Sequence, residues 1–118
     1  MITRIAAVQR ELRSLDIPAV LITNLTDVRY LSGFTGTTAY MLVDIEKAVF
    51  FTDSRFSIQA AEEVSENIIV EIVSDYSSIY KERCSFFKKI LLQPSCSINI
   101  SSKIAAQGVE IYLDEKDF

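Results

Sequence analysis

Residues 29–60, RYLSGFTGTTAYMLVDIEKAVFFTDSRFSIQA, decide how this chain folds. Gly33 and Gly36, two of the three glycines of the chain, flank Phe34. Two apolar runs follow, and the segment 52–56, TDSRF, marks the point where a strand gives way to a helix. A loop, a hairpin and a strand-to-helix junction in this order indicate an α/β domain.

The two apolar runs, residues 39–43 and 48–52, are separated by the polar turn 44–47 and predict a β-hairpin. Their apolarity is continuous instead of alternating, which is typical of a sheet covered on both faces. After the second run the period becomes helical to about residue 65, with Asp53 or Ser54 as the N-cap. Loop glycines such as Gly33 and Gly36 ordinarily mark tight turns.

Working outward from this stretch, the pattern predicts helices and strands in near alternation. Before this stretch we expect a helix over 3–15 capped by Thr3, a strand at 19–22, and a helix over 24–32. Thr26 would cap the helix over 24–32, Gly33 would close it, and Tyr30 and Leu31 would face inward. After the stretch we expect a strand at 68–73, a helix over 77–92, a strand at 97–100, a helical turn at 102–107 closed by Gly108, and a strand at 109–113. The tail 114–118 is charged and predicts no closing helix. The predicted fold class is α/β, with a mixed five- to six-stranded sheet flanked by helices.

Composition limits the classes of function. The 118 residues fit one domain, 1–118, of which 49% of residues are apolar, so disorder is excluded. The net charge of −4 argues against a nucleic-acid partner, which would need a basic face. Nothing approaches the roughly 18 consecutive apolar residues of a membrane span, and charged residues interrupt any signal-peptide core. We therefore expect a cytoplasmic protein with no membrane partner.

The chain has no histidine, which removes histidine-based triads, imidazole bases and most zinc chemistry. Cys84 and Cys96 lack a CxxC spacing; we expect them on a helix and a later strand, as free thiols in a reducing compartment.

Carboxylates are therefore the main candidates for catalysis. Asp44, Asp53 and Asp75 fall at or near predicted strand ends, where a carboxylate-metal nuclease would place its ligands. Turn and helix-cap preferences explain all three positions without a metal, and the acidity of the chain argues against holding phosphates. The loop from Gly33 to Gly36 leads into a strand, whereas phosphate-binding loops lead into a helix.

Arg55 is unusual, because a cation in the first turn of a helix opposes the helix dipole. Two interpretations stay open from the residues alone. The side chain could point into a cleft and bind a carboxylate, or it could form an ordinary salt bridge with Glu62 or Glu63.

These same residues carry a resemblance to a known family. The pattern Asn24…RYLSGFTG, two strands and then TDSRF…Gln59-Ala60 is similar to the N…YLTGF-x-G and TDGRY-x-x-QA motifs of the N-terminal domain of the Xaa-Pro aminopeptidase, prolidase and creatinase family. The likeness extends over about residues 3–75. Ser54 stands for the usual glycine, and Phe56 stands for tyrosine.

The resemblance implies a ribonuclease H-like α/β domain that precedes a larger catalytic domain. In the family, that second domain carries two divalent metal ions, manganese or cobalt, on two Asp, one His and two Glu, and it hydrolyses the bond before proline. The implied partners are this C-terminal domain, a second subunit in a homodimer, and a peptide with proline at the second position. The chain itself is expected to hold no cofactor, no metal ligand and no catalytic residue.

By motif match, the substrate-proximal residues are expected to be Phe34, Thr35, Gly36, Arg55 and Phe56. Phe34 would form a pocket wall near the proline ring, and Arg55 would steer a substrate carboxylate or anchor the loop. An interpretation in which both motifs only hold the hairpin and helix together stays open. So does a different class of function, a free-standing α/β binding module with no peptidase activity.

Overall fold

The structure is a computed structural model that describes residues 3–114. These residues form a six-stranded sheet with the strand order β4-β3-β2-β1-β5-β6. The strands are β1 (Ala19–Ile22), β2 (Tyr40–Asp44), β3 (Ala48–Thr52), β4 (Ile69–Ile72), β5 (Lys89–Leu92) and β6 (Glu110–Leu113). β2 is antiparallel to both β1 and β3, whereas the pairs β3–β4, β1–β5 and β5–β6 are parallel. The predicted mixed sheet flanked by helices is therefore confirmed.

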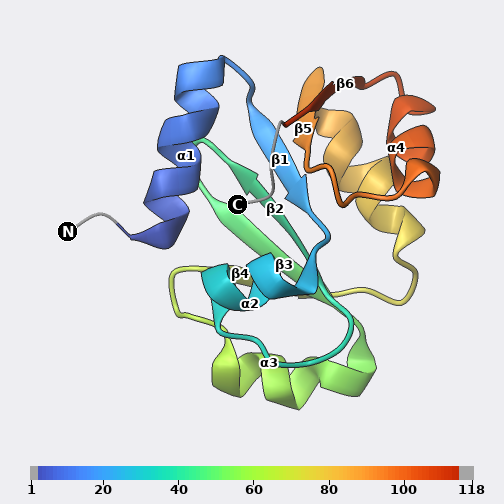
Figure 1. The fold of residues 1–118 in the computed structure, drawn as a ribbon. Coiled ribbons are helices and arrows are strands. Elements are labelled where there is room, and N and C mark those ends of the chain that lie inside the picture. The colour runs from blue at the N-terminus through green and yellow to red at the C-terminus, as the bar shows by residue number, and fades with distance from the viewer. Residues whose placement is uncertain (1–2, 115–118) are drawn as a thin grey trace.

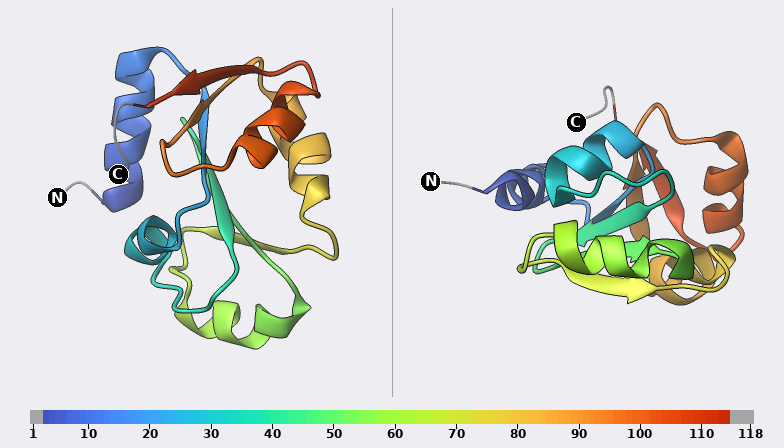
Figure 2. Two further views of the ribbon diagram at one scale, coloured as in Figure 1. Left: turned by 45° about the vertical axis from the view of Figure 1, so that its right-hand side comes forward. Right: turned by 90° about the horizontal axis from the view of Figure 1, so that it is seen from below.

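Helices cover the two faces of this sheet as separate layers (Figure 1). The helices are α1 (Arg4–Leu15), α2 (Leu25–Ser32), α3 (Ser57–Glu63) and α4 (Ile98–Ala105), with the shorter turns η1 (Ser54–Phe56), η2 (Ile79–Arg83) and η3 (Cys84–Phe86). Figure 2 shows α1 and α2 on one side of the sheet and η2 and α4 on the other. β1 and β3 are buried along their whole length, as their continuous apolarity predicts.

Two buried clusters fill the space between the layers. The first lies under α1, α2 and α3 and includes Leu12, Val28, Phe34 and Phe50. The second lies under η2 and α4 and includes residues such as Ile79. Alternate residues of the central strands point into opposite clusters, so a single sheet serves both.

Several predicted caps are confirmed and one is wrong. Thr3 caps α1, with its hydroxyl accepting from the Ala6 N–H at 3.0 Å. The cap of α2 is Asn24 instead of Thr26, because the Asn24 side chain reaches the N–H groups of Thr26 and Asp27. Gly33 ends α2 in the left-handed conformation, as predicted.

Tyr30 was expected to face inward with Leu31, and this prediction is wrong for Tyr30. Leu31 is buried, whereas Tyr30 is 53% exposed. The Arg4 guanidinium lies over the Tyr30 ring at 4.1 Å and donates to the Tyr30 carbonyl at 2.7 Å.

The chain between residues 77 and 100 departs most from the expectation. The predicted helix over 77–92 ends at Phe86, and Phe87 has extended backbone angles. β5 follows between β1 and β6, so Ile90 and Leu91 are strand residues. The predicted strand at 97–100 is instead the start of α4, because the Ser97 hydroxyl caps it by accepting from the Ile100 N–H.

The remaining predictions concern the cysteines and the tail. Both cysteines are free thiols, as expected, with Cys84 in η3. Cys96 lies in the turn before α4 and not in a strand. Gly108 has a positive φ of 83° before β6, in agreement with a closing glycine. The prediction for the tail 114–118 falls, apart from Asp114, on residues that lie outside the described part of the chain.

No helix among residues 3–114 is long and apolar enough to cross a membrane.

Candidate functional site

The strand-to-helix junctions of this sheet share one edge. β1, β3, β4, β5 and β6 run in the same direction, since β2 alone reverses. Asp53 follows β3 at this carboxyl edge, and Tyr76 belongs to the loop that follows β4. In open α/β sheets ligands bind outside the carboxyl ends of the strands. The segment 52–56 therefore lies where this type of sheet ordinarily carries its chemistry.

The loop that begins at Gly33 is held tightly against α3. Gly33 has a φ of +86°, and a Cβ at this position would lie 2.9 Å from the backbone oxygen of Glu63. The Phe34 ring folds back beneath Gly36, where an added Cβ would lie 2.5 Å from Phe34 Cε2. Glycine is therefore required at Gly33 for the backbone conformation and at both positions for close packing.

Phe34 itself is a core residue. Its side chain is 1% exposed and packs edge-on against Phe50 at 4.9 Å and against Phe56 at 5.9 Å between ring centroids. The expected role of this ring as the wall of a substrate pocket does not agree with that burial, because the ring has no surface left for a ligand. The exposed part of the loop is at Thr35 and Thr37, beside the partly buried Gly36.

Glu63 and Gln59 join this loop to α3. The Glu63 carboxylate accepts hydrogen bonds from the backbone N–H of Thr35 at 2.8 Å and from its hydroxyl at 3.0 Å. Gln59 donates its amide to the Thr35 hydroxyl at 3.0 Å and to Glu63 at 3.2 Å. The bond from the Thr35 N–H is the main reason that the pKa of Glu63 lies below its usual value. The two sequence motifs therefore form one connected unit.

Arg55 has a partner that the sequence did not predict. Its Nε and Nη2 atoms donate to the two oxygens of Asp53 at 2.8 and 2.9 Å. The salt bridge with Glu62 or Glu63, one of the two interpretations left open by the sequence, is therefore not the one that forms. The guanidinium also lies 5.0 Å from the centre of the Phe56 ring. The Arg55 side chain is nevertheless 67% exposed. Its outer edge, with the remaining N–H groups, faces away from Asp53.

Asp53 is the centre of this arrangement. It caps η1 by accepting from the Arg55 N–H, and it accepts a further hydrogen bond from the Tyr76 hydroxyl at 2.8 Å. The hydrogen bonds from Arg55 hold the pKa of the Asp53 carboxyl far below its usual 3.8. Burial, together with the bond to Asp53, raises the pKa of Tyr76 to about 12. Tyr76 therefore stays a hydrogen-bond donor across the physiological pH range.

These shifts predict a pH dependence with a definite sign. Because the folded-state pKa of Asp53 is lowered below 3.8, its contribution to stability is present above pH 3.8 and is lost as the pH falls toward the folded-state value. In Tyr76→Phe we expect the Asp53 carboxyl to titrate at a higher pH, since one hydrogen bond to the charged form is removed. NMR titration of the Asp53 carboxyl carbon measures this directly.

Tyr30→Phe is the matched control for this titration, because Tyr30 is exposed at the surface and its ring lies against Arg4. It should leave the titration midpoint of Asp53 unchanged. A wild-type midpoint at or above 3.8 would show that the Arg55 contact does not persist in solution.

The three aspartates that suggested a nuclease have local roles. Asp44 accepts from the N–H groups of Glu46 and Lys47 in the hairpin turn, at 2.7 and 2.9 Å. Asp75 accepts from the N–H and hydroxyl of Ser77. Within residues 3–114, His, Cys, Asp and Glu side chains form no group of three or more that could hold a metal ion. The turn and cap interpretation of Asp44, Asp53 and Asp75 therefore fits the structure.

The comparison with known families matches residues 4–109 to the creatinase/prolidase N-terminal domain. The uncharacterized peptidase YqhT of Bacillus subtilis (strain 168) is 42% identical over 57 residues, which make up 48% of this chain and 16% of that protein.

Solved structures give the same fold. The N-terminal, creatinase/prolidase-like domain of a protein from Corynebacterium diphtheriae has a TM-score of 0.80 and 25% identity, and the match covers 94% of each chain. The prolidase from Pyrococcus horikoshii OT3 has a TM-score of 0.83 with 22% identity, over 92% of this chain and 31% of the prolidase. The N-terminal domain of the cytoplasmic peptidase PepQ from Mycobacterium tuberculosis H37Rv has a TM-score of 0.76 with 23% identity, covering 90% and 88% of the two chains. At these identities the prolidase and PepQ show the fold alone.

Proposed function

Because the chain belongs to the creatinase/prolidase N-terminal domain family, we propose that it is the non-catalytic N-terminal domain of a proline-specific metallopeptidase, an Xaa-Pro aminopeptidase or dipeptidase. Its proposed roles are oligomerisation and shaping of the substrate pocket of the parent enzyme. The observation that carries the second role is the exposed Arg55 guanidinium, fixed at the carboxyl edge of the sheet by Asp53 and Phe56.

Arg55 would act mainly through the direction of its hydrogen bonds. Its contact with Asp53 makes a nearly neutral pair, so long-range attraction of a substrate carboxylate is weak. The free edge of the planar guanidinium still presents N–H groups in fixed positions, which suits a carboxylate or a peptide carbonyl. The contact between the Phe34 and Phe56 rings joins the loop of Thr35 and Gly36 to the segment that carries Arg55.

The chemistry of the reaction would come from outside this chain. The two divalent metal ions proposed for the parent, manganese or cobalt, would be held by its C-terminal catalytic domain, and they would activate the attacking water. The residues of this domain would contribute binding and orientation of a peptide with proline at the second position. The proposed compartment is the cytoplasm, in keeping with the name of the related PepQ peptidase.

Exposed apolar side chains support a contact with another domain or subunit. Ile58 on α3 is 76% exposed, and Ile69 and Ile72 on the edge strand β4 are about half exposed. α3 packs beside β4, and Ile72, which pairs with Thr52, projects to the face of the sheet that carries α3, whereas Ile69, which pairs with Val49, projects to the opposite face. Apolar surface of this kind is a common feature of interfaces. We assign it to the homodimer or to the catalytic domain of the parent.

The first test measures whether the domain has peptidase activity without the catalytic domain of the parent. The 118-residue chain, incubated with Mn²⁺ and an Xaa-Pro peptide, should give no turnover. Robust turnover would refute the proposal.

Reading the coding sequence downstream of Phe118 is a second test. An open reading frame that encodes Asp, His and Glu metal ligands would support a peptidase, whereas a stop codon would support a free-standing binding module.

The third test concerns Arg55 in the parent enzyme. We expect Arg55→Ala to lower kcat/KM by about ten- to a hundredfold, since a hydrogen bond to a charged group contributes about 1.5–3 kcal/mol. Steady-state kinetics on an Xaa-Pro peptide measures the change. Arg83→Ala is the matched control, because Arg83 pairs with Glu71 elsewhere on the surface. Unchanged KM and kcat in Arg55→Ala would leave this residue with a structural role only.

A further inference from the structure

The edge strand β4 exposes backbone groups that another strand can bind. Within residues 3–114, β4 is the last strand on its side of the sheet, with β3 as its neighbour. The Val73 N–H donates to the Thr52 carbonyl of β3 at 2.8 Å. Because backbone N–H groups alternate in direction along a strand, those of Val70 and Ile72 point away from β3. Such an edge presents N–H and C=O groups at the spacing that a further strand requires.

The side chains of β4 are apolar on both faces of the sheet. Ile69, Val70 and Ile72 are 49%, 37% and 45% exposed. Val70 and Ile72 project to the face that carries α3, whereas Ile69 projects to the opposite face. A domain that docks on one face of the sheet covers one of these two sets and leaves the other in water. A strand added at the edge lies beside both sets, because cross-strand neighbours meet on each face.

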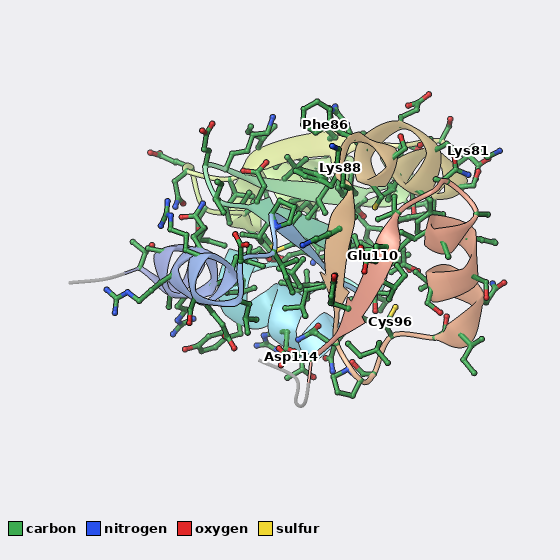
Figure 3. The ribbon with its side chains drawn as sticks, turned by 90° about the horizontal axis from the view of Figure 1, so that it is seen from above. Lys81, Phe86, Lys88, Cys96, Glu110 and Asp114 are labelled. Carbon is green, nitrogen blue, oxygen red and sulfur yellow. The ribbon has the colours of Figure 1, made fainter. Side chains whose placement is uncertain are left out.

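β4 also lacks the features with which many edge strands prevent pairing. Residues 68–73, IIVEIV, include neither lysine nor proline, and their one charged side chain, Glu71, forms a salt bridge with Arg83 of the same chain. The opposite edge differs, because β6 begins with Glu110 and is followed by Asp114. Figure 3 shows Glu110 on β6 and Asp114 where the chain leaves this strand. The edge that is suited to pairing is therefore β4.

We propose that β4 pairs antiparallel with β4 of a second copy of the chain, so that the two sheets join into one. An antiparallel pair of identical strands is related by a two-fold axis, and it covers both edges in a single contact. The second copy brings a strand with the same apolar side chains on both faces, so each exposed set meets an apolar partner. This inference rests on the homodimer proposed above and names the surface that forms it.

The charge of Glu71 restricts the register of this pair. Residues that point outward must lie opposite outward residues of the second copy, so the two-fold axis passes through Val70, Glu71 or Ile72. An axis at Glu71 places the two Glu71 side chains directly opposite each other, where like charges are destabilising. The axis therefore lies at Val70 or at Ile72. Glu71 is then opposite an apolar residue of the second copy, either Ile69 or Val73.

Sedimentation equilibrium of the 118-residue chain tests the interface. The wild-type chain should dimerise below a concentration of about 1 mM. Ile72→Lys should raise the dissociation constant by about tenfold or more, because a symmetric dimer contains the substitution twice. Ile58→Lys is the matched control, since Ile58 is 76% exposed on α3 and does not belong to the strand edge. It should change the dissociation constant by about twofold or less.

Two outcomes of this experiment would overturn the proposal. One is a wild-type chain that stays monomeric at about 1 mM. The other is an effect of Ile58→Lys as large as that of Ile72→Lys, which would place the contact on α3 and not on the edge of β4. Neither outcome depends on peptidase activity, so a failure of this interface is distinguishable from a failure of the function proposed for the parent.

Amide hydrogen exchange is a second readout that needs no variant. The N–H groups of Val70 and Ile72 should exchange about tenfold or more slowly in the dimer than in dilute, monomeric protein, because they gain hydrogen-bond partners. The Val73 N–H already donates to Thr52 and should slow much less. An equal change at all three amides, or no change, would overturn the proposal.

Discussion

Replacing Phe34 with alanine is expected to destabilise the domain by about 3–5 kcal/mol, the usual range for deleting a buried phenylalanine ring. The ring is 1% exposed and lies edge-on to Phe50 of β3 and to Phe56 of η1. It therefore joins the loop, the hairpin and the strand-to-helix junction. Its removal leaves a cavity beneath Gly36, at the position where the two motifs meet.

Urea denaturation of the isolated chain measures this change, and Phe86→Ala is the matched control. Phe86 is 83% exposed, and the ring that it contacts is Phe87, at 5.2 Å between centroids. The same deletion there should alter the free energy of unfolding by about 0.5 kcal/mol or less. If Phe34→Ala were as mild as Phe86→Ala and yet impaired the parent peptidase, Phe34 would have to be returned to the substrate pocket.

The part of the fold around residues 29–60 could be predicted because its signals are local. The turn 44–47 lies between two apolar runs of equal length, and both runs became strands of one hairpin. Asp53 sits immediately after the second run and caps the following turn through its own side chain. Each of these features depends on neighbours within a few residues, and local physics is what sequence patterns record.

The segment 77–100 was predicted wrongly because its structure depends on distant partners. The sequence from Ile79 to Leu91 has apolar residues at helical spacing, yet its last part is inserted as a parallel strand beside β1, about seventy residues earlier. A buried strand of four residues cannot be separated from a helix by periodicity alone. Ile98 and Ile100 have a high propensity for strands, but the Ser97 cap and the packing of α4 against β6 stabilise a helix here.

In the candidate site, too, the local features could be predicted and the contacts between distant residues could not. The residues expected near the substrate were selected by motif, but the motif did not reveal that Arg55 pairs with Asp53. Nor did it reveal that Tyr76, 23 residues from Asp53 in sequence, donates to the same carboxylate. Glu63 was considered as a partner of Arg55 and instead binds Thr35.

Gly33→Ala should have the second large effect, for two reasons that can be separated. An alanine there must keep a φ of +86°, which costs about 1–2 kcal/mol for a residue with a Cβ. Its Cβ would also lie 2.9 Å from the Glu63 backbone oxygen, so α3 must move away from the loop. That movement weakens the Thr35–Glu63 contacts, and overpacking of this kind costs a further 1–3 kcal/mol or so. We expect a total of about 2–5 kcal/mol.

Gly108→Ala isolates the first of these two terms. Gly108 has nearly the same φ, +83°, but an added Cβ meets no atom within 4 Å. Its substitution should therefore cost about 1–2 kcal/mol in urea denaturation, the backbone term alone. The difference between the two variants measures how tightly the loop is held against α3. Equal losses would mean that α3 moves away without an energetic cost. The loop would then be held too loosely to keep the pocket wall that we propose beside Arg55 in a fixed position.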